Sequence, residues 1–462
     1  MDLISRRVLF LVTRFRGCGQ VRFGRDGAGS KCGKFILNAN AERGISCSIS
    51  WMGETIQTQC CIAGGGPAGM MLGFLLARAG VDVQVLEKHA DFLRDFRGDT
   101  VHPSTLEVMY ELGLLGEFLK RPHQEVRELS GQVANEMVPV ADLTHLPTHC
   151  KFIALMPQWD FLNFIAEQGK RYPGFHLRMQ TEVTDLIRED GRVAGVQATT
   201  SHGALEVRAG LTIGADGRRS VVRQRAGLEV VNLGAPMDVL WMQISRRDGD
   251  SGRTFGHVDA GRIFVMIDRA DYWQCAFVIP KGGIEDIRQK GLAAFREEIA
   301  RLAPFLRDRV DELRDWKNIS LLTVVVDRLS RWFLPGLLCI GDAAHAMSPI
   351  GGVGINLAIQ DAVAASNILA RKLRESTVRE SDLHAVQQRR MFPTRATQRM
   401  QIFVQNRVIS RVLSRTKPLG LPWLLKLLRA CPFLRRYPAR IVGVGFRPEH
   451  VKTVEAKSAT TK

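Results

Sequence analysis

Three glycine-rich stretches of the chain each follow a short apolar run and contain or precede an acidic residue. The first reads GGGPAG over residues 64–69, and the others begin at Gly214 and Gly341. Glycines let a phosphate group approach the backbone closely, and a helix that starts at such a turn offers unpaired N–H groups to that phosphate. Neighbouring carboxylates can accept hydrogen bonds from sugar hydroxyls. These residue types predict a nucleotide-binding site.

The first stretch lies between elements that could hold it in place. Residues 59–63 (QCCIA) are typical of a short buried strand, and the residues after the glycine turn have helical spacing up to Gly80, a plausible position just past a helix end. Residues 81–87 (VDVQVLE) predict a second strand. The order strand, glycine turn, helix, strand is that of a dinucleotide-binding unit, and by itself it does not distinguish FAD from NAD.

Each residue of this unit has a physical role. Gly64 permits the tight turn, Gly66 allows a pyrophosphate to approach, and Gly69 lets the helix pack closely on the strand. Glu87 lies 21 residues after Gly66, where a carboxylate can bind a ribose diol. The predicted nucleotide contacts of this unit are Gly64, Gly66, Pro67, Ala68, Gly69, Glu87 and Lys88.

The other two stretches repeat this arrangement of strand, turn and helix. Residues 205–213 (LEVRAGLTI) predict a strand that leads to Asp216 and Gly217, and Asp216 could also simply cap the next helix. Residues 337–341 (LLCIG) predict a buried strand before a long helical pattern. The third motif contributes the candidate residues Gly341, Asp342, Pro349, Gly351, Gly352, Gly354 and Asn356.

The three motifs, in this order and at these separations, resemble those of the FAD-dependent monooxygenases of the aromatic-hydroxylase type, the para-hydroxybenzoate hydroxylase-like superfamily. The resemblance covers about residues 57–400. It implies an α/β fold in which a Rossmann-like FAD-binding domain of the GR2 type, with a mixed sheet, is interleaved with an antiparallel-sheet substrate domain. A helical C-terminal segment follows.

The resemblance also implies roles for individual residues. Glu87 would bind the adenosine ribose, Asp342 the ribityl chain, and the motif of Asp216 both FAD and NAD(P)H. Pro349 and the amides of Gly351 and Gly352 would line the edge of the isoalloxazine ring. Two matches between the motifs are Arg97, expected near the pyrophosphate, and Gln158, expected on the flavin nucleotide. The alternatives are a surface ion pair for Arg97 and a helix N-terminal position for Gln158. No catalytic side chain is assigned, and no metal site is expected.

In this family NAD(P)H reduces FAD, and a flavin C4a-hydroperoxide transfers one oxygen atom to an aromatic or other conjugated molecule, by hydroxylation or epoxidation. Only one GxGxxG-type turn follows a strand, so the expected NADH or NADPH visits a groove and leaves. Three alternatives stay open: a reductase or dehydrogenase like the prenyl-chain saturases, a flavin halogenase, and a flavin-binding protein without turnover. Substrate-dependent O₂ consumption with an oxygenated product distinguishes the monooxygenase from them.

The expected organisation divides the chain into seven segments. They are residues 1–51, an extension outside the fold; 52–170, the first part of the FAD-binding domain; 171–204, a sheet segment; 205–235, the second FAD-binding part; 236–326, the antiparallel substrate sheet; 327–400, the third FAD-binding part; and 401–462, a basic helical segment and tail. Within the substrate sheet, Trp241, Met266 and Trp273 are candidates for lining the cavity, although each could be ordinary core.

The distribution of charge along the chain limits the classes of partner that it can bind. The 462 residues contain 64 Lys+Arg and 47 Asp+Glu, a formal net charge of +17. The excess lies at the two ends, since residues 1–50 have nine cations and three acids, and residues 389–452 have fifteen cations and one acid. The nearly neutral body argues against a nucleic-acid enzyme. Nine cysteines, an odd number without metal-ligand spacing, indicate reduced thiols in the cytoplasm.

Near the C-terminus the sequence LPWLLKLLRACPFLRRYPARIVGVG is basic and amphipathic. Trp423, Leu424, Leu427 and Leu428 can share one face of a helix. Such a segment either docks on the protein body or lies on an anionic membrane surface, which would make the cytoplasmic enzyme a peripheral membrane protein.

Overall fold

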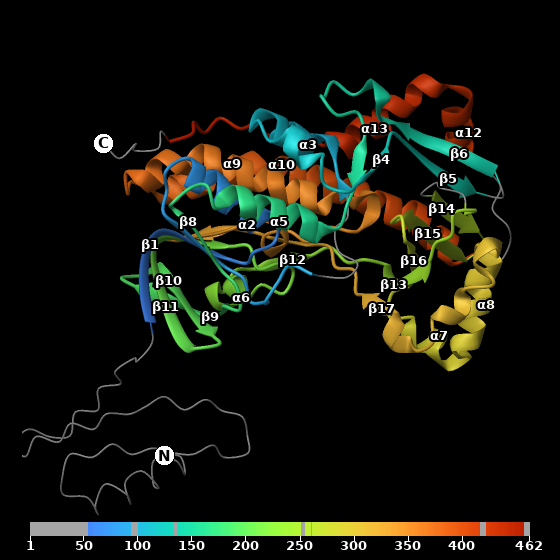
Figure 1. Ribbon diagram of the computed structural model, residues 1–462, viewed down its shortest axis with the longest axis horizontal. Helices are drawn as coiled ribbons and strands as arrows, with labels where there is room; N and C mark the ends of the chain where they lie inside the picture. Colours follow the sequence, from blue (N-terminus) through green and yellow to red (C-terminus); the bar gives the residue numbers. More distant parts are fainter. Residues whose placement is uncertain are drawn as a thin grey trace, which may run out of the picture.

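The computed structural model shows two sheets connected by a layer of long helices (Figure 1). The expected extension at residues 1–51 and the candidate Arg97 lie outside the residues that the structure describes. The described residues are 54–93, 100–133, 136–250, 255–259, 261–415 and 422–456.

The first sheet is mixed and carries the nucleotide motifs. Its strands follow the order β19-β20-β11-β1-β2-β8, and all the neighbouring pairs are parallel except β19 with β20. The antiparallel strands β10 and β9 extend from β11. Burial on both sides explains the apolar ends of these strands. The bounds are β1 Glu54–Ala63, β2 Val83–Leu86, β8 Phe175–Arg178, β9 Glu182–Glu189, β10 Arg192–Thr200, β11 Gly203–Gly214, β19 Phe333–Leu334 and β20 Leu337–Cys339.

Four long helices form the layer beside this sheet: α2 Pro67–Arg78, α5 Gln158–Gly169, α9 Gly354–Arg374 and α10 Glu380–Val404 (Figure 1). Residues 350–374, around α9, form a stretch long and apolar enough to cross a membrane, but 78% of its apolar 18-residue window is buried. It packs against α2 and belongs to the core of the first sheet. The apolar run is therefore explained by burial within the protein.

The second sheet follows the order β17-β13-β16-β15-β14-β5-β6. Two of its strands come from residues 128–142, which lie within the segment expected to belong to the FAD-binding domain alone. The helices α7 and α8 cover one face (Figure 1). The bounds are β5 Glu128–Val133, β6 Glu136–Asp142, β13 Met237–Ser245, β14 Phe255–Asp259, β15 Arg262–Asp268, β16 Tyr272–Pro280, β17 Ser320–Leu322, α7 Ile284–Lys290 and α8 Leu292–Leu302.

The two faces of this sheet have different neighbours. Met266 and Trp273 are fully buried in a core with α8, so for these two residues the structure supports the alternative of ordinary core and not a place in the cavity wall. Side chains alternate along a strand, and both residues point to the helix-covered face. Trp241 lies on the opposite face, in a cluster with Ile350 of the third glycine motif and Ile409.

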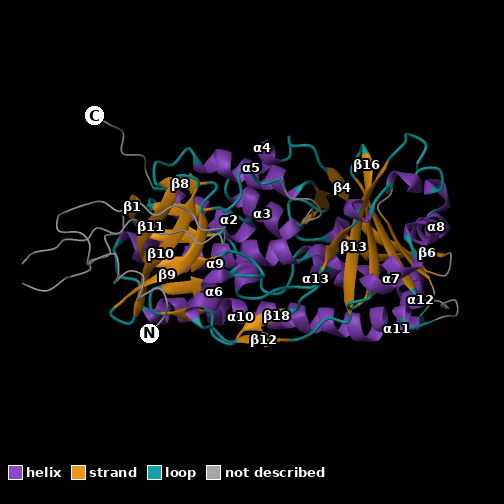
Figure 2. Cartoon of the chain, turned by 90° about the horizontal axis from the view of Figure 1, so that it is seen from below, coloured by secondary structure: helices purple, strands orange, loops and turns teal. Residues whose placement is uncertain are grey.

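Shorter elements link the two sheets. Figure 2 shows α10 and α11 running along one side of the molecule from the first sheet towards the second. The remaining strands are β3 Thr100–Val101, β4 Gln124–Val126, β7 Ile153–Leu155, β12 Val230–Asn232 and β18 Asp327–Leu329. The remaining helices include α3 Pro103–Glu111, α4 Leu115–Phe118, α6 Val221–Ala226, the π-helix η7 Gln405–Ile409, α11 Ser410–Leu413, α12 Trp423–Ala430, the 3₁₀ turn η8 Pro432–Arg435 and α13 Arg436–Gly443. The predicted mixed α/β architecture is confirmed.

Candidate cofactor and substrate site

The predicted motifs meet at one edge of the first sheet. The register pairs Ala63 with both Leu86 and Gly214, and Gly214 with Cys339. Because β2, β1, β11 and β20 are adjacent and parallel, the loops that follow them emerge side by side. In open α/β sheets, ligands bind at the carboxyl ends of such strands. The structure thus brings together the first glycine turn, Glu87 and the turns that contain Asp216 and Asp342.

Glycine is required at Gly64 and Gly69 of the first turn for steric reasons, whereas Gly66 has open space beside it. Gly64 has φ +107°, and a Cβ there would lie 2.3 Å from the carbonyl oxygen of Ala215. A Cβ on Gly69 would lie 2.0 Å from the carbonyl oxygen of Gly64. Gly66, with φ −75°, would meet nothing within 4 Å. The open space beside Gly66 and the uncapped start of α2 fit a phosphate group.

Glu87 is tied to this turn through its carboxylate. The N–H of Gly65 donates to Oε2 at 2.9 Å, and the N–H of His89 donates to Oε1 at 3.0 Å. The side chain is nearly buried, whereas that of Lys88 is exposed. Binding of the ribose by Glu87 stays a prediction, and the structure places its carboxylate against the turn expected to hold the pyrophosphate.

The second and third motifs contact each other. The guanidinium Nε of Arg218 lies 3.4 Å from Oδ2 of Asp342. Asp216 accepts a hydrogen bond from the N–H of Val222 at 3.1 Å, so it does cap α6, but its Oδ1 is buried with no hydrogen-bond partner among the described residues. Burial raises the pKa of Asp216, against hydrogen bonds from Ser220 and Val222 that lower it. An orphaned carboxylate oxygen at this edge fits a nucleotide that supplies a donor.

The glycine loop of the third motif is held in a left-handed conformation. Gly351 and Gly352 have φ +77° and +63°, and a Cβ on Gly352 would lie 2.4 Å from Oγ1 of Thr100. Thr100 Oγ1 donates to the Gly352 carbonyl at 3.0 Å. The loop leads into the N-terminus of α9 at Gly354. Its N–H groups and the helix dipole favour a group that carries negative charge.

Asn356 fastens this loop to the neighbouring segment. Its Oδ1 accepts from the N–H of His102 at 2.9 Å and from Thr105 Oγ1 at 2.7 Å. Its Nδ2 donates to the carbonyl of Thr100 at 3.2 Å. The side chain is committed to protein partners, so a contact with the cofactor, which stays a prediction, would have to involve its backbone.

Sequence reasoning missed a row of buried glutamines behind the loop. Gln401 accepts from the N–H of Ser348 at 3.1 Å and donates to the carbonyls of Ser348 at 2.9 Å and Ile350 at 3.0 Å. Gln398 donates to the carbonyl of Ala346 at 3.2 Å, and Gln405 to Ser348 Oγ at 2.8 Å. Positions 398, 401 and 405 share one helical face. Three glutamines at this spacing were the available signal.

His345 belongs to a buried charged network. Its Nε2–H donates to Asp361 Oδ2 at 2.5 Å, and Arg390 Nε donates to Oδ1 at 2.9 Å. The N–H of Gly341 also donates to Asp361 at 3.1 Å. Burial would raise the pKa of Asp361, but His345 and Arg390 outweigh it and hold the pKa below its ordinary value. His345 thus stabilises the turn of the third motif through Asp361.

Gln158 is the first residue of α5, and its side chain is partly exposed. The preceding strand β7 pairs with β3, whose Thr100 holds the Gly352 loop. This pairing brings the start of α5 into the neighbourhood of the third motif. Contact of Gln158 with the flavin nucleotide stays a prediction.

His102 links the same loop to α13. It is fully buried, and its Nδ1–H donates to the carbonyl of Val442 at 2.7 Å. Burial lowers the pKa of His102 to about 4, although the hydrogen bond to Val442 opposes this shift. Its Nε2 is buried without a hydrogen-bond partner among the described residues, so protonation would create an unpaired buried N–H.

We expect this histidine to make stability depend on pH. Between the ordinary pKa of 6.5 and the folded value of about 4, the unfolded chain binds a proton that the folded chain does not. The histidine therefore contributes nothing adverse above pH 6.5 and lowers the free energy of unfolding by about 3 kcal/mol as the pH falls to 4. Urea unfolding between pH 4 and 6.5 measures the free energy of unfolding at each pH. This free energy should change less steeply with pH in His102→Gln than in the wild type. Replacement of the exposed His202 should leave the slope unchanged, and an unchanged slope in His102→Gln would contradict the assignment.

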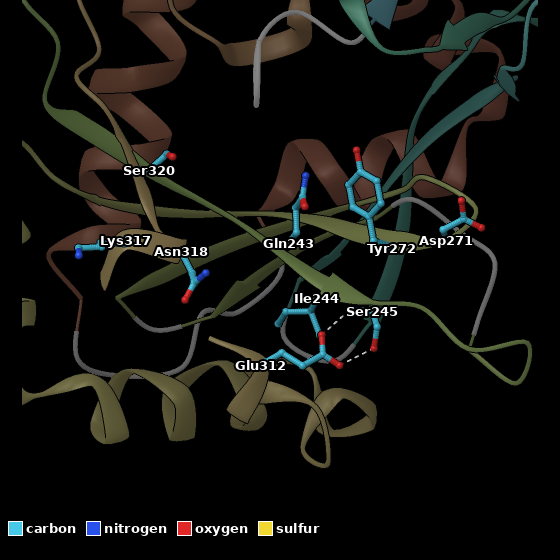
Figure 3. A pocket seen from close by; sticks show the side chains of 9 residues that line it. All are labelled: Gln243, Ile244, Ser245, Asp271, Tyr272, Glu312, Lys317, Asn318 and Ser320. Carbon is cyan, nitrogen blue, oxygen red and sulfur yellow. Dashed lines mark hydrogen bonds between the residues drawn. The ribbon is translucent and has the colours of Figure 1, made fainter. Parts of the chain in front are cut away.

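A polar pocket lies at the end of the sheet face that carries Trp241 (Figure 3). Its volume is about 470 Å³. Figure 3 shows Gln243 and Tyr272 pointing to the same side of the sheet, while Glu312 accepts hydrogen bonds from Ser245 below them. Apolar side chains of Val239 and Val278 continue the same face towards Ile350. The lining residues are Gln243, Ile244, Ser245, Asp271, Tyr272, Glu312, Lys317, Asn318 and Ser320.

Three glycine-containing turns converge at one edge of the mixed first sheet, and the second sheet faces the third turn. This is the arrangement expected of a flavoprotein oxygenase of the aromatic-hydroxylase type. The open approach to Gly66 and the orphaned oxygen of Asp216 fit FAD. The chain belongs to the family described as FAD binding domain, which matches residues 57–400. It is an FAD-dependent monooxygenase, and the reductase and halogenase alternatives are not favoured.

Individual relatives agree with this assignment. The chain is 33% identical over 365 residues to the 6-methylpretetramide 4-monooxygenase of Streptomyces rimosus. The alignment covers 78% of this chain and 87% of the relative. The fold of this chain is similar to that of the anhydrotetracycline hydroxylase of Streptomyces rimosus, with a TM-score of 0.66 and 23% identity. The superposition covers 84% of this chain and 76% of the hydroxylase. The p-nitrophenol 4-monooxygenase of Pseudomonas putida DLL-E4 also has a TM-score of 0.66, with 19% identity and coverage of 84% and 97%.

Proposed function

We propose that this monooxygenase hydroxylates a phenolic substrate built of fused rings. The observation that carries the proposal is the composition of the sheet face opposite α8. Trp241 is only partly buried and lies on this face with the buried Val239 and Val278, and the face adjoins the polar pocket at Gln243 and Tyr272. Apolar walls with a few convergent polar groups are typical of sites that orient a small molecule. Two relatives are named for compounds of the tetracycline type, which supports this substrate class.

The residues of the chain would divide the work as follows. When bound, FAD takes a hydride from NAD(P)H and activates O₂. The glycine turn at Gly66 and the edge near Asp216 and Asp342 would hold the nucleotide part. The N–H groups of the Gly351–Gly352 loop would stabilise negative charge at the ring, aided by the N-terminus of α9. The apolar face around Trp241 would keep water away from the reacting atoms, and Gln243 and Tyr272 would orient substrate oxygens.

The test is anaerobic stopped-flow reduction of the holoenzyme by NADH or NADPH in the presence of candidate substrates. We expect anhydrotetracycline or a similar fused-ring phenol to accelerate flavin reduction, and para-nitrophenol to have little effect. The double variant Gln243→Leu, Tyr272→Phe should lose most of this acceleration, while Arg371→Met, at an exposed position on α9, should keep it. Acceleration by para-nitrophenol alone would contradict the substrate class. Consumption of O₂ without an oxygenated product would contradict hydroxylation of that compound.

The same proposal includes a location. The described cysteines are free thiols, and five of the six are buried. Burial raises the pKa of Cys61 to about 12, which keeps that thiol protonated and unreactive. These thiols support a reducing compartment, the cytoplasm. A peripheral contact with a membrane, through the C-terminal segment, completes the proposed setting.

A further inference from the structure

Large apolar side chains are exposed together on α12, η8 and α13. Trp423 is 76% exposed, and the others are between 38% and 65% exposed. We call this set the C-terminal aromatic face. An exposed apolar patch of this kind indicates a binding surface. Its members are Trp423, Leu424, Leu427, Phe433 and Tyr437.

The helices that carry this face are fixed to the protein body. Leu428 and Ala439 are buried on the inner sides of α12 and α13. Arg435 donates to the carbonyls of Leu428 at 2.8 Å and Arg429 at 3.1 Å, which folds η8 back against the end of α12. A Cβ on Gly443 would lie 2.7 Å from Leu146, so α13 packs tightly on the residues before β7. Figure 1 shows α12 and α13 beside β6. The exposed apolar side chains therefore project from helices that are packed against the protein body.

Cations surround the apolar side chains. Residues 422–448 contain six Lys or Arg and no acidic residue. Arg429 pairs with Glu136 of β6, and Arg435 caps α12, so both contribute to local structure. Lys426, Arg436 and Arg440 are exposed on the same elements as the apolar residues, and Arg436 also contacts Nε2 of His145 at 3.3 Å. The surface thus combines aromatic and leucine side chains with positive charge.

The positive charge of the C-terminal aromatic face indicates which kind of partner can bind it. A second copy that docked through the same face would bring like charges together, and residues 1–50, with nine cations and three acids, are no complement either. Aromatic rings and leucines interspersed with cations match the chemistry of a bilayer interface, where rings lie at the headgroup level. Each Lys or Arg near an anionic surface strengthens binding to that surface.

We propose that the C-terminal aromatic face binds the surface of a lipid bilayer that contains anionic lipids. The apolar side chains enter the headgroup region, and Lys426, Arg436 and Arg440 lie against lipid phosphates. The face is coupled to the site, because Val442 of α13 accepts the hydrogen bond from His102, whose N–H donates to Asn356. Bilayer contact would hold the third glycine motif near a reservoir of apolar molecules. This inference rests on the peripheral membrane contact proposed above, and it adds the residues that make the contact and the class of lipid that they bind.

The experiment uses the full-length holoenzyme and sedimentation with vesicles of phosphatidylcholine, with or without phosphatidylglycerol. We expect binding to the anionic vesicles, weak binding to pure phosphatidylcholine, and a decrease as salt increases. Trp423→Ser with Leu427→Ser should weaken binding by about tenfold or more, because two apolar anchors are lost. Lys426→Gln with Arg440→Gln should weaken binding to the anionic vesicles only. Val230→Ser with Leu321→Ser, exposed residues on β12 and β17 away from this face, should have no effect.

Two results would overturn the proposal. One is a wild-type holoenzyme that stays in solution with anionic vesicles at low salt. The other is self-association in analytical ultracentrifugation that Trp423→Ser with Leu427→Ser abolishes, since the face would then bind a second copy. FAD content and substrate-free reduction by NAD(P)H should be the same in all variants, which shows that a loss of vesicle binding does not come from unfolding.

Discussion

Replacement of Gly66 by valine should abolish retention of FAD while the protein stays folded. The backbone at Gly66 has φ −75°, which any residue adopts, and a Cβ would meet no atom within 4 Å. The new side chain would instead fill the space at the start of α2 where the pyrophosphate is expected. Loss of two charge-assisted hydrogen bonds, at about 1.5 kcal/mol each, would weaken FAD binding roughly 100-fold. Visible flavin absorbance after gel filtration, and FAD titration of the apoprotein, measure this loss.

Gly64→Val is the matched control, because the same side chain should act there through folding. Gly64 has φ +107°, and its Cβ would lie 2.3 Å from the carbonyl oxygen of Ala215. The carbonyl oxygen of Ala215 belongs to the backbone just after β11, so it cannot shift to make room for the new Cβ. We expect Gly64→Val to be insoluble or to unfold at much lower urea concentration than the apoprotein. A fully yellow Gly66→Val protein would refute the predicted nucleotide site.

The largest effect on stability is expected at the buried ion pair between Asp361 and Arg390. Both side chains are essentially inaccessible, with 2.9 Å between Arg390 Nε and Asp361 Oδ1. Asp361→Ala would leave the guanidinium buried with only part of its partners, and it would remove the acceptor of the Gly341 N–H. Breaking a buried pair in this way costs about 3–5 kcal/mol in the free energy of unfolding. Urea unfolding of the apoprotein measures this cost.

A surface pair on α9 provides the comparison. Arg371 and Glu375 lie 4.0 Å apart and are mostly exposed, so Arg371→Met should change the free energy of unfolding by no more than about 0.5 kcal/mol. The double variant Asp361→Leu, Arg390→Met should be more stable than Asp361→Ala, because the buried guanidinium is removed together with Asp361 and Glu449 keeps its ion pair with Arg389. A cost below about 1 kcal/mol for Asp361→Ala would show that the buried network is dispensable.

Local patterns predicted the elements whose requirements are local. The turn at Asp190 and Gly191 predicts a hairpin, and both residues have positive φ between β9 and β10. Gly80 follows α2 with φ +82°, as its position predicts. The glycine turns could be recognised because a left-handed φ, or the lack of room for a Cβ, restricts the residue type at that position alone.

Other features depend on which strands and helices meet. Whether a strand residue faces the site or the core is decided by its pairing register, so Met266 and Trp273 could not be told from Trp241 by residue type. The role of the glutamine row on α10 and η7 depends on the loop packed against it, which is more than 50 residues away along the chain.

The sequence by itself determined the glycine turns, the family and the mixed α/β class, because each depends on residues within a short window or on the order of motifs along the chain. The tertiary structure alone decided that the Asn356 side chain binds protein partners, that β5 and β6 join the second sheet, and that the C-terminal aromatic face is exposed. These outcomes depend on long-range packing, since a polar or apolar side chain acquires its role from partners that only folding brings within contact distance.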